Sequence, residues 1–123
     1  MNSNKILIID NDEGIQFAFH SILQKEGYKG VKAMLGHTAL ELLKNDNISG
    51  VFLELDLPDM DGLNVLELIR NFNPLVPVVI ITGMGTPQSI KRSAELGIIE
   101  FLEKPVSLAK MREILKKIKY HNK

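Results

Sequence analysis

Two carboxylates stand directly after short apolar runs, and they are the first residues of this chain that could do chemistry. Asp10 follows the run at residues 6–9, and Glu54 follows the run at residues 51–53. Neighbouring carboxylates repel each other, so the pKa of one or both rises unless a cation lies between them. Carboxylate oxygens are the ligands that a hard cation such as Mg²⁺ prefers. The pair therefore predicts a candidate cation site.

The polar residues close to these carboxylates have simpler explanations. Asn11 offers one neutral oxygen in a place where an acid would add charge. Asp12 stands where a helix amino terminus favours negative charge. Asp59 and Asp61 fit a turn and a helix cap. Capping does not explain Asp10, because that residue ends a buried run.

A hydroxyl and an ammonium occupy comparable places later in the chain. Thr82 follows the run at residues 78–81. Its hydroxyl can donate to an anion, although the glycine-rich stretch at residues 83–85 is also typical of an ordinary loop. Lys104 directly precedes Pro105. Alone it would be a surface lysine, whereas beside the two carboxylates it would have partners.

The apolar pattern predicts the elements that position these groups. The three runs are rich in β-branched residues and do not alternate with polar ones, which is typical of parallel strands buried on both faces. Two weaker strands are predicted at residues 30–34 and 98–102. Stripes of apolar side chains at helical spacing fill the gaps. They are Ile15, Phe19, Ile22 and Leu23; Ala39, Leu42 and Leu43; Val65, Leu68, Ile69 and Phe72; Ile90 and Ala94; and Leu108, Met111, Leu115 and Ile118.

A strand followed by a helix thus occurs five times. This order predicts an α/β fold, a five-stranded parallel sheet with five helices in a (βα)5 doubly wound three-layer sandwich. Asp12, Asp61 and Ser107 are the predicted helix caps. In such sheets, sites form at the carboxyl ends of the strands, which is where the four candidate groups lie.

The composition excludes several classes of protein. The chain has 15 basic and 15 acidic residues, and this neutrality argues against direct nucleic-acid binding. It has no cysteine, which excludes disulfides, thiolate catalysis and cysteine-ligated zinc. No apolar run is long enough to span a membrane, and the amino terminus does not resemble a signal peptide. We expect a single cytoplasmic domain over residues 1–123, without membrane binding.

Four motifs, in this order and at this spacing, resemble the receiver domain of two-component response regulators. They are ILIIDNDE at residues 6–13, LPDMDGL at 57–63, ITGMGT at 81–86 and FLEKP at 101–105. The resemblance covers residues 4–119 and implies a CheY-like, flavodoxin-like fold. The last two motifs further resemble receivers attached to NtrC-type transcription activators.

The resemblance implies a role for each site residue. In the family, a kinase phosphorylates an Asp at the end of the third strand, beside a bound Mg²⁺. Carried over to this chain, Thr82 and Lys104 would contact the phosphoryl group. Phe101 would be the aromatic switch residue, and Pro105 would be the following proline, which is usually cis.

The metal and acceptor positions depart from the family pattern in two places. Asp10 matches the first acid after the first strand, and the backbone carbonyl of Asp56 matches another metal ligand. The position of the family's second acid, however, holds Asn11, and the acceptor position four residues before Pro58 holds Glu54. The extra methylene displaces the carboxylate by about 1.5 Å, which can cost on the order of 100-fold in rate. The neutral Asn11 weakens Mg²⁺ binding, so both changes act against phosphoryl transfer.

These departures support two hypotheses, and a third is disfavoured. The first is an atypical, pseudo-receiver-like signalling module that is not an enzyme, or at most phosphorylates itself weakly from a phosphodonor. In this module Glu54 holds an active-like state or simply pairs with Lys104. The second is a phosphorylation-competent receiver that uses Glu54 or Asp56, with weakened Mg²⁺ binding through Asp10 and Asp12. A flavodoxin-like cofactor binder is disfavoured, because the acidic residues after the first strand would repel a phosphate.

The resemblance also implies protein partners. A histidine kinase would meet the first helix beside Gln16, His20 and Gln24. An effector, an output domain or a second copy of the chain would meet the surface formed by residues 86–96 and 98–119. The side chains expected to line that contact are Met84, Ile99, Phe101 and Met111.

Overall fold

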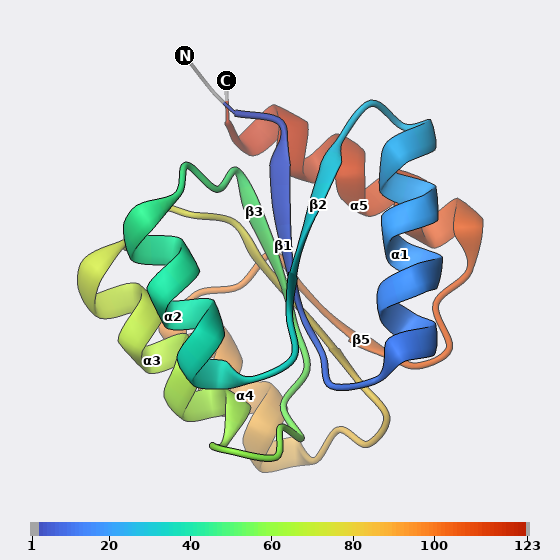
Figure 1. Cartoon of the computed structure of the whole chain (residues 1–123). Helices are drawn as coiled ribbons and strands as arrows, with labels where there is room; N and C mark the ends of the chain where they lie inside the picture. The colour runs from blue at the N-terminus through green and yellow to red at the C-terminus, as the bar shows by residue number, and fades with distance from the viewer. Residues whose placement is uncertain (1–2, 123) are drawn as a thin grey trace.

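A computed structural model describes residues 3–122 and contains the predicted alternation of strands and helices (Figure 1). The strands are β1 (Lys5–Ile9), β2 (Lys29–Ala33), β3 (Gly50–Leu53), β4 (Val78–Thr82) and β5 (Glu100–Glu103). The helices are α1 (Glu13–Lys25), α2 (Gly36–Asn45), α3 (Gly62–Phe72), α4 (Pro87–Leu96) and α5 (Leu108–His121). No helix among the described residues is both long and apolar enough to cross a membrane.

All five strands are parallel and form one sheet in the order β2-β1-β3-β4-β5. Ile9 pairs with Leu53, and Leu53 pairs with Ile80, so β1, β3 and β4 end at nearly the same level. The residues that follow these strands therefore meet at one edge of the sheet. The strand order changes direction around β1 and β3, and such a switch point is where parallel sheets place their sites.

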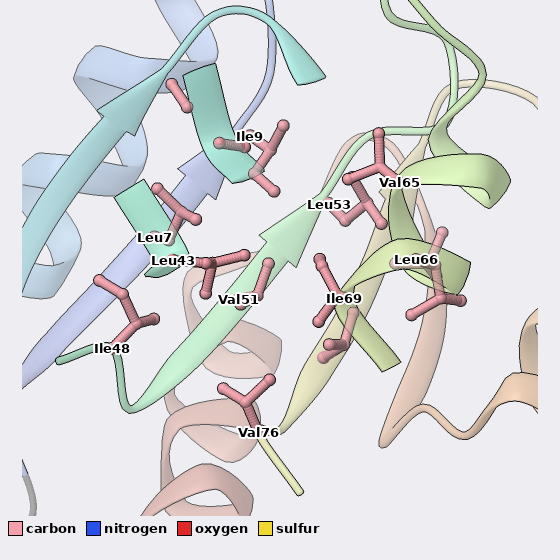
Figure 2. Close-up of a cluster of buried hydrophobic side chains, with 14 of the residues drawn as sticks. Leu7, Ile9, Leu43, Ile48, Val51, Leu53, Val65, Leu66, Ile69 and Val76 are labelled. Atoms are coloured by element: carbon pink, nitrogen blue, oxygen red, sulfur yellow. The ribbon is translucent and has the colours of Figure 1, made fainter. Parts of the chain in front are cut away.

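Alternate residues of each strand face opposite layers of helices. Figure 2 shows one of the two resulting cores, in which Leu7 lies beside Leu43 of α2 and Leu53 lies on the side of Val65 and Ile69 of α3. The second core joins β1, β3 and β4 to α1 and α5. Figure 1 shows α1 and α5 on one face of the sheet and α2, α3 and α4 on the other. The predicted three-layer sandwich is confirmed.

The predicted helix caps are confirmed as well. The side chains of Asp12, Asp61 and Ser107 each accept a hydrogen bond from a backbone amide in the first turn of α1, α3 and α5. The carboxyl-terminal turn of α4 ends at Gly97, whose φ of +97° lies in the left-handed region that favours glycine. These local signals set where the helices begin and end.

Several predicted details are wrong. Strand β5 begins at Glu100 rather than at residue 98, and β2 is displaced by one residue toward the amino terminus from the predicted 30–34. In α4, the predicted apolar stripe of Ile90 and Ala94 is exposed, and Ser93 is buried instead. The hydroxyl of Ser93 donates to the carbonyl of Ile90, which satisfies it within its own helix. Helix α4 thus presents apolar side chains outward.

Candidate functional site

The carboxyl edge of the sheet brings Asp10, Glu54, Thr82 and Lys104 together, as the sequence predicts. The Nζ of Lys104 lies 2.7 Å from Oδ2 of Asp10 and 2.8 Å from Oε1 of Glu54. Both carboxylates are buried, with 3% and 6% of their residue surfaces exposed. The lysine ammonium therefore lies between the two acids at the position where the sequence predicts a cation.

The second carboxylate oxygen of Glu54 is occupied by backbone amides. Its Oε2 accepts hydrogen bonds from the amides of Leu55 at 2.7 Å and Asp56 at 3.2 Å. Burial alone would raise the pKa of Glu54. Hydrogen bonds from the Lys104 ammonium, the Thr82 hydroxyl and the Asp56 amide outweigh burial and lower this pKa below its ordinary value. Glu54 is therefore ionised at neutral pH, with donors at both oxygens.

The same contacts act in the opposite direction on Lys104. Burial would lower the pKa of its ammonium, but the hydrogen bonds and charges of Asp10 and Glu54 raise it above the ordinary lysine value. The peptide bond between Lys104 and Pro105 is cis. The amide of Lys104 donates to the carbonyl of Thr82, and this bond fixes the end of β5 beside the end of β4. The ammonium is thus charged and positioned by the neighbouring strand.

A buried glutamine on α1 braces the Asp10 end of β1. Gln16 is 2% exposed, and its Nε2 donates to the carbonyls of Ile8, Asp10 and Ala33. The prediction that Gln16 belongs to a kinase-facing surface is therefore wrong. The sequence spacing indicates this burial, because Gln16 stands three positions before the buried Phe19 and so shares the buried face of the helix.

The other predicted ligands are exposed residues, although the backbone of Asp56 adjoins the cluster, because its amide donates to Oε2 of Glu54. Asn11, Asp12 and Asp56 are exposed, and the carboxylate of Asp12 caps α1. The amide of Asp12 donates to Oδ1 of Asp10, so that oxygen also has a donor. Within residues 3–122, no group of three or more acidic, histidine or cysteine side chains is placed to hold a metal ion. In this arrangement both buried carboxylates already have the Lys104 ammonium as a partner.

Gly62 packs closely against the loop that carries Glu54. A Cβ on Gly62 would lie 2.4 Å from Cα of Leu55 and 2.6 Å from the carbonyl oxygen of Glu54. The first turn of α3 therefore packs directly on the backbone of the site. By contrast, a Cβ on Gly83 would contact nothing, whereas a Cβ on Gly85 would meet the ring of Phe101.

Asp59 has a larger role than the predicted turn. Its carboxylate accepts hydrogen bonds from the amides of Gly36 and His37 at the start of α2, a helix whose own N-cap residue supplies no side-chain bond. Its Oδ2 also lies 2.6 Å from Nδ1 of His37. Burial would raise the pKa of Asp59, but these contacts lower it to about 2. Asp59 thereby fastens the loop after β3 to α2, a tertiary contact that local sequence does not reveal.

Three of the four side chains predicted to line the output surface are accessible. Met84 is 80% exposed, and Ile99 and Phe101 are half-buried, so these three side chains are accessible. Met111 is 1% exposed and packs in the core between the sheet and α5, so it cannot line a contact with another protein. Its place one turn before Leu115 on the same helix face is the signal of a core residue.

Comparison with known proteins agrees with this geometry. A family model described as the response regulator receiver domain matches residues 6–116. Sporulation initiation phosphotransferase F of Bacillus subtilis (strain 168) is 32% identical over 117 residues, which cover 95% of this chain and 94% of that protein. An NtrX-like response regulator of Rickettsia bellii (strain RML369-C) is 35% identical over 114 residues, which cover 91% of this chain and 24% of that relative. This chain thus spans about a quarter of the NtrX-like protein.

Solved structures show the same fold. A CheY-like receiver domain protein from Methanospirillum hungatei JF-1 has a TM-score of 0.91 at 25% identity, and the match covers 98% of this chain and 97% of that chain. The receiver domain dimer of beryllofluoride-activated NtrC4 has a TM-score of 0.86 at 30% identity, and the match covers 97% of this chain and 96% of that chain. The motifs, the sheet order and the cluster of acids and lysine at its carboxyl edge therefore have one explanation: the chain belongs to the response regulator receiver domain family.

Proposed function

We propose that this receiver domain is an atypical one, a signalling and protein-interaction module in which phosphoryl transfer is lost or much reduced. The observation that carries the proposal is the position of Lys104, whose ammonium is within 2.8 Å of both Asp10 and Glu54. This ion pair offsets part of the negative charge of the two buried acids and occupies Oε1 of Glu54. The neutral Asn11 supports the same conclusion, because it leaves the site with one negative charge fewer.

The bonding of Glu54 explains why its carboxylate is a poor nucleophile. One oxygen pairs with the Lys104 ammonium, and the other accepts two backbone amides. An attack on phosphorus requires a carboxylate oxygen held in line with the donor, so at least one of these sets of bonds would have to break first. The additional methylene of glutamate places the carboxylate beside Lys104 and Thr82, where it mimics part of the charge of a phosphoryl group.

Incubation with acetyl phosphate and Mg²⁺, followed by intact mass spectrometry, tests this proposal. We expect no phosphorylated fraction for the unaltered chain. The double variant Glu54→Asp with Asn11→Asp should gain one phosphoryl group, because it restores the shorter acceptor and the missing acid. Asp56→Asn is the control and should change neither result. Stoichiometric labelling of the unaltered chain would refute the proposal.

A phosphorylation-competent receiver is the second candidate, and the exposed Asp56 favours it. The carboxylate of Asp56 lies at the surface beside the cluster, where a phosphodonor can reach it. A relative that is 32% identical is named a phosphotransferase. In this case the same assay would label the unaltered chain, and either Glu54→Gln or Asp56→Asn would abolish the label. An unlabelled chain rejects this candidate.

We further propose that a histidine kinase or a downstream effector is the partner, and that the chain pairs with a second copy through α4, β5 and α5. Ile90 of α4 faces outward with 44% of its surface exposed, and the similar NtrC4 receiver domain is described as a dimer. Sedimentation should show a dimer that Ile90→Glu dissociates. Leu68→Glu on α3, where the side chain is 41% exposed, is the matched control and should leave the dimer intact. A monomer at all concentrations would exclude the dimer.

A further inference from the structure

An open groove of about 770 Å³ lies at the edge of the sheet opposite to Lys104. Its walls are the loop before β4, the loop before β5 and the last turns of α5. The lining is mainly apolar and includes Leu75, Ile98 and Tyr120. Volumes of this size hold several side chains of a bound segment or one drug-sized molecule.

Two large apolar side chains at this groove are exposed to solvent. Leu75 and Tyr120 are each 79% exposed, whereas Ile98 is half-buried and forms part of the floor. Exposed apolar groups gathered around one concave site mark an interaction site more strongly than groups scattered over a surface.

The charge beside the groove is positive. Of the charged residues that line the groove, Arg70, Lys116 and Lys117 are basic and Glu113 is acidic. Lys117 already pairs with Glu100 at 2.6 Å. Lys116 also lines the groove, and no ion pair of its side chain is present among residues 3–122. An acidic group on a bound partner would therefore find an available ammonium there.

Hydrogen bonds to backbone carbonyls fix one wall of the groove. The guanidinium of Arg70, which lines one wall, donates to Gly97 at 2.7 and 3.1 Å, to Val76 at 2.8 Å and to Asn73 at 3.1 Å. These bonds tie the loop before β4 to the loop that follows α4. A wall fixed in this way costs less entropy when a partner binds.

We propose that this groove binds an acidic amphipathic segment of a partner protein, with apolar side chains between Leu75 and Tyr120 and carboxylates facing Lys116. A symmetric contact with a second copy at this groove is disfavoured, because it would bring two basic rims together, and Ile90, on which the proposed pairing through α4, β5 and α5 is tested, does not line the groove. A bilayer is disfavoured because its flat surface does not fill a concave groove. The groove lies far along the strands from the acid–lysine cluster, so this proposal stands independently of any change in phosphoryl transfer.

The test uses a fluorescein-labelled helical peptide of about four turns with leucine on one face and glutamate on the other. We expect a saturable rise in fluorescence polarisation with the full chain, weaker at high salt. A peptide with lysine in place of every glutamate should not bind. Equal binding of the two peptides, or no saturable binding of the acidic one, would overturn the proposal.

Matched variants locate the site. Leu75→Ser should weaken binding about tenfold, whereas Phe17→Ser, which alters a side chain of nearly equal exposure on α1, should not. Lys116→Glu should weaken binding about fivefold at low salt, whereas Lys119→Glu on the same helix, which does not line the groove, should have less effect. Circular dichroism confirms that each variant is folded. Equal effects of the two variants within a pair would overturn the assignment. It would also be overturned if the chain bound phosphatidylglycerol vesicles, lost that binding in Leu75→Ser, and did not bind the acidic peptide.

Discussion

Replacing Lys104 by methionine removes the only positive charge seen within 3 Å of the buried carboxylates of Asp10 and Glu54 in the described chain. Methionine keeps most of the side-chain volume, so the change is mainly one of charge. Removing one partner of a buried ion pair costs about 3–5 kcal/mol, because the other charge remains buried and unpaired. Since 20% of the Lys104 side chain is exposed, we expect the lower end, about 3 kcal/mol near neutral pH.

The loss should depend on pH in a defined direction. In the unaltered chain the pKa of Glu54 is lowered, so this group stabilises the fold above its unfolded pKa and loses that contribution as pH falls. In Lys104→Met, burial is no longer offset by the ammonium, and the pKa of Glu54 rises. The variant then regains stability on protonation, and the gap between the two proteins narrows toward about pH 4.

Urea unfolding followed by far-ultraviolet circular dichroism measures this gap, since the chain has no tryptophan. Lys117→Met is the matched control. Its ammonium pairs with Glu100 at 2.6 Å, but 45% of its side chain is exposed, so the expected loss is below about 1 kcal/mol. If the two variants lose equal stability at neutral pH, or if the Lys104→Met gap does not narrow on acidification, the ion pair does not stabilise the site as described.

Three further predictions concern the supports of the site. Gly62→Ala should lower the free energy of unfolding in urea by about 1–3 kcal/mol, because the new Cβ meets backbone atoms. Gly83→Ala should lower it little, and equal losses for the two variants would contradict the packing described. Gln16→Leu should cost about 1–3 kcal/mol, because it strips a donor from three buried carbonyls, and faster exchange of amides near the end of β1 should accompany the loss. Asp59→Asn should destabilise the chain most above about pH 4 and least near pH 2. The reason is that the lowered pKa of Asp59 contributes stability that is lost as pH falls between those values. A stability difference between the two proteins that does not depend on pH would refute this.

The parts of the molecule that follow from local pattern were predictable. Buried strands lack alternation, and capping residues act within one turn, so β1, β3, β4 and the caps at Asp12, Asp61 and Ser107 could be predicted from sequence. The convergence of Asp10, Glu54 and Lys104 was also predictable, because parallel strands end at one edge.

What escaped prediction depends on contacts between distant segments. The outward face of α4 could not be inferred from Ile90 and Ala94, because a serine that bonds to its own helix can be buried in place of an apolar residue. The role of Asp59 depends on the amides of α2, which lie more than 20 residues earlier in the chain. The sequence also left open whether Glu54 pairs with Lys104, and the structure shows that it does.

The hydrogen bonds of Arg70 have a mechanical consequence for α4. They hold the carbonyl of Gly97, at the carboxyl end of that helix, while Ser93 is the only α4 residue that is buried. These bonds restrain the carboxyl end of α4. The helix has 10 residues and is about 15 Å long, so a tilt of about 10° would displace Thr86 by roughly 2–3 Å and Gly97 hardly at all. A tilt of this kind would move the segment that joins the end of β4 at Thr82 to the start of α4.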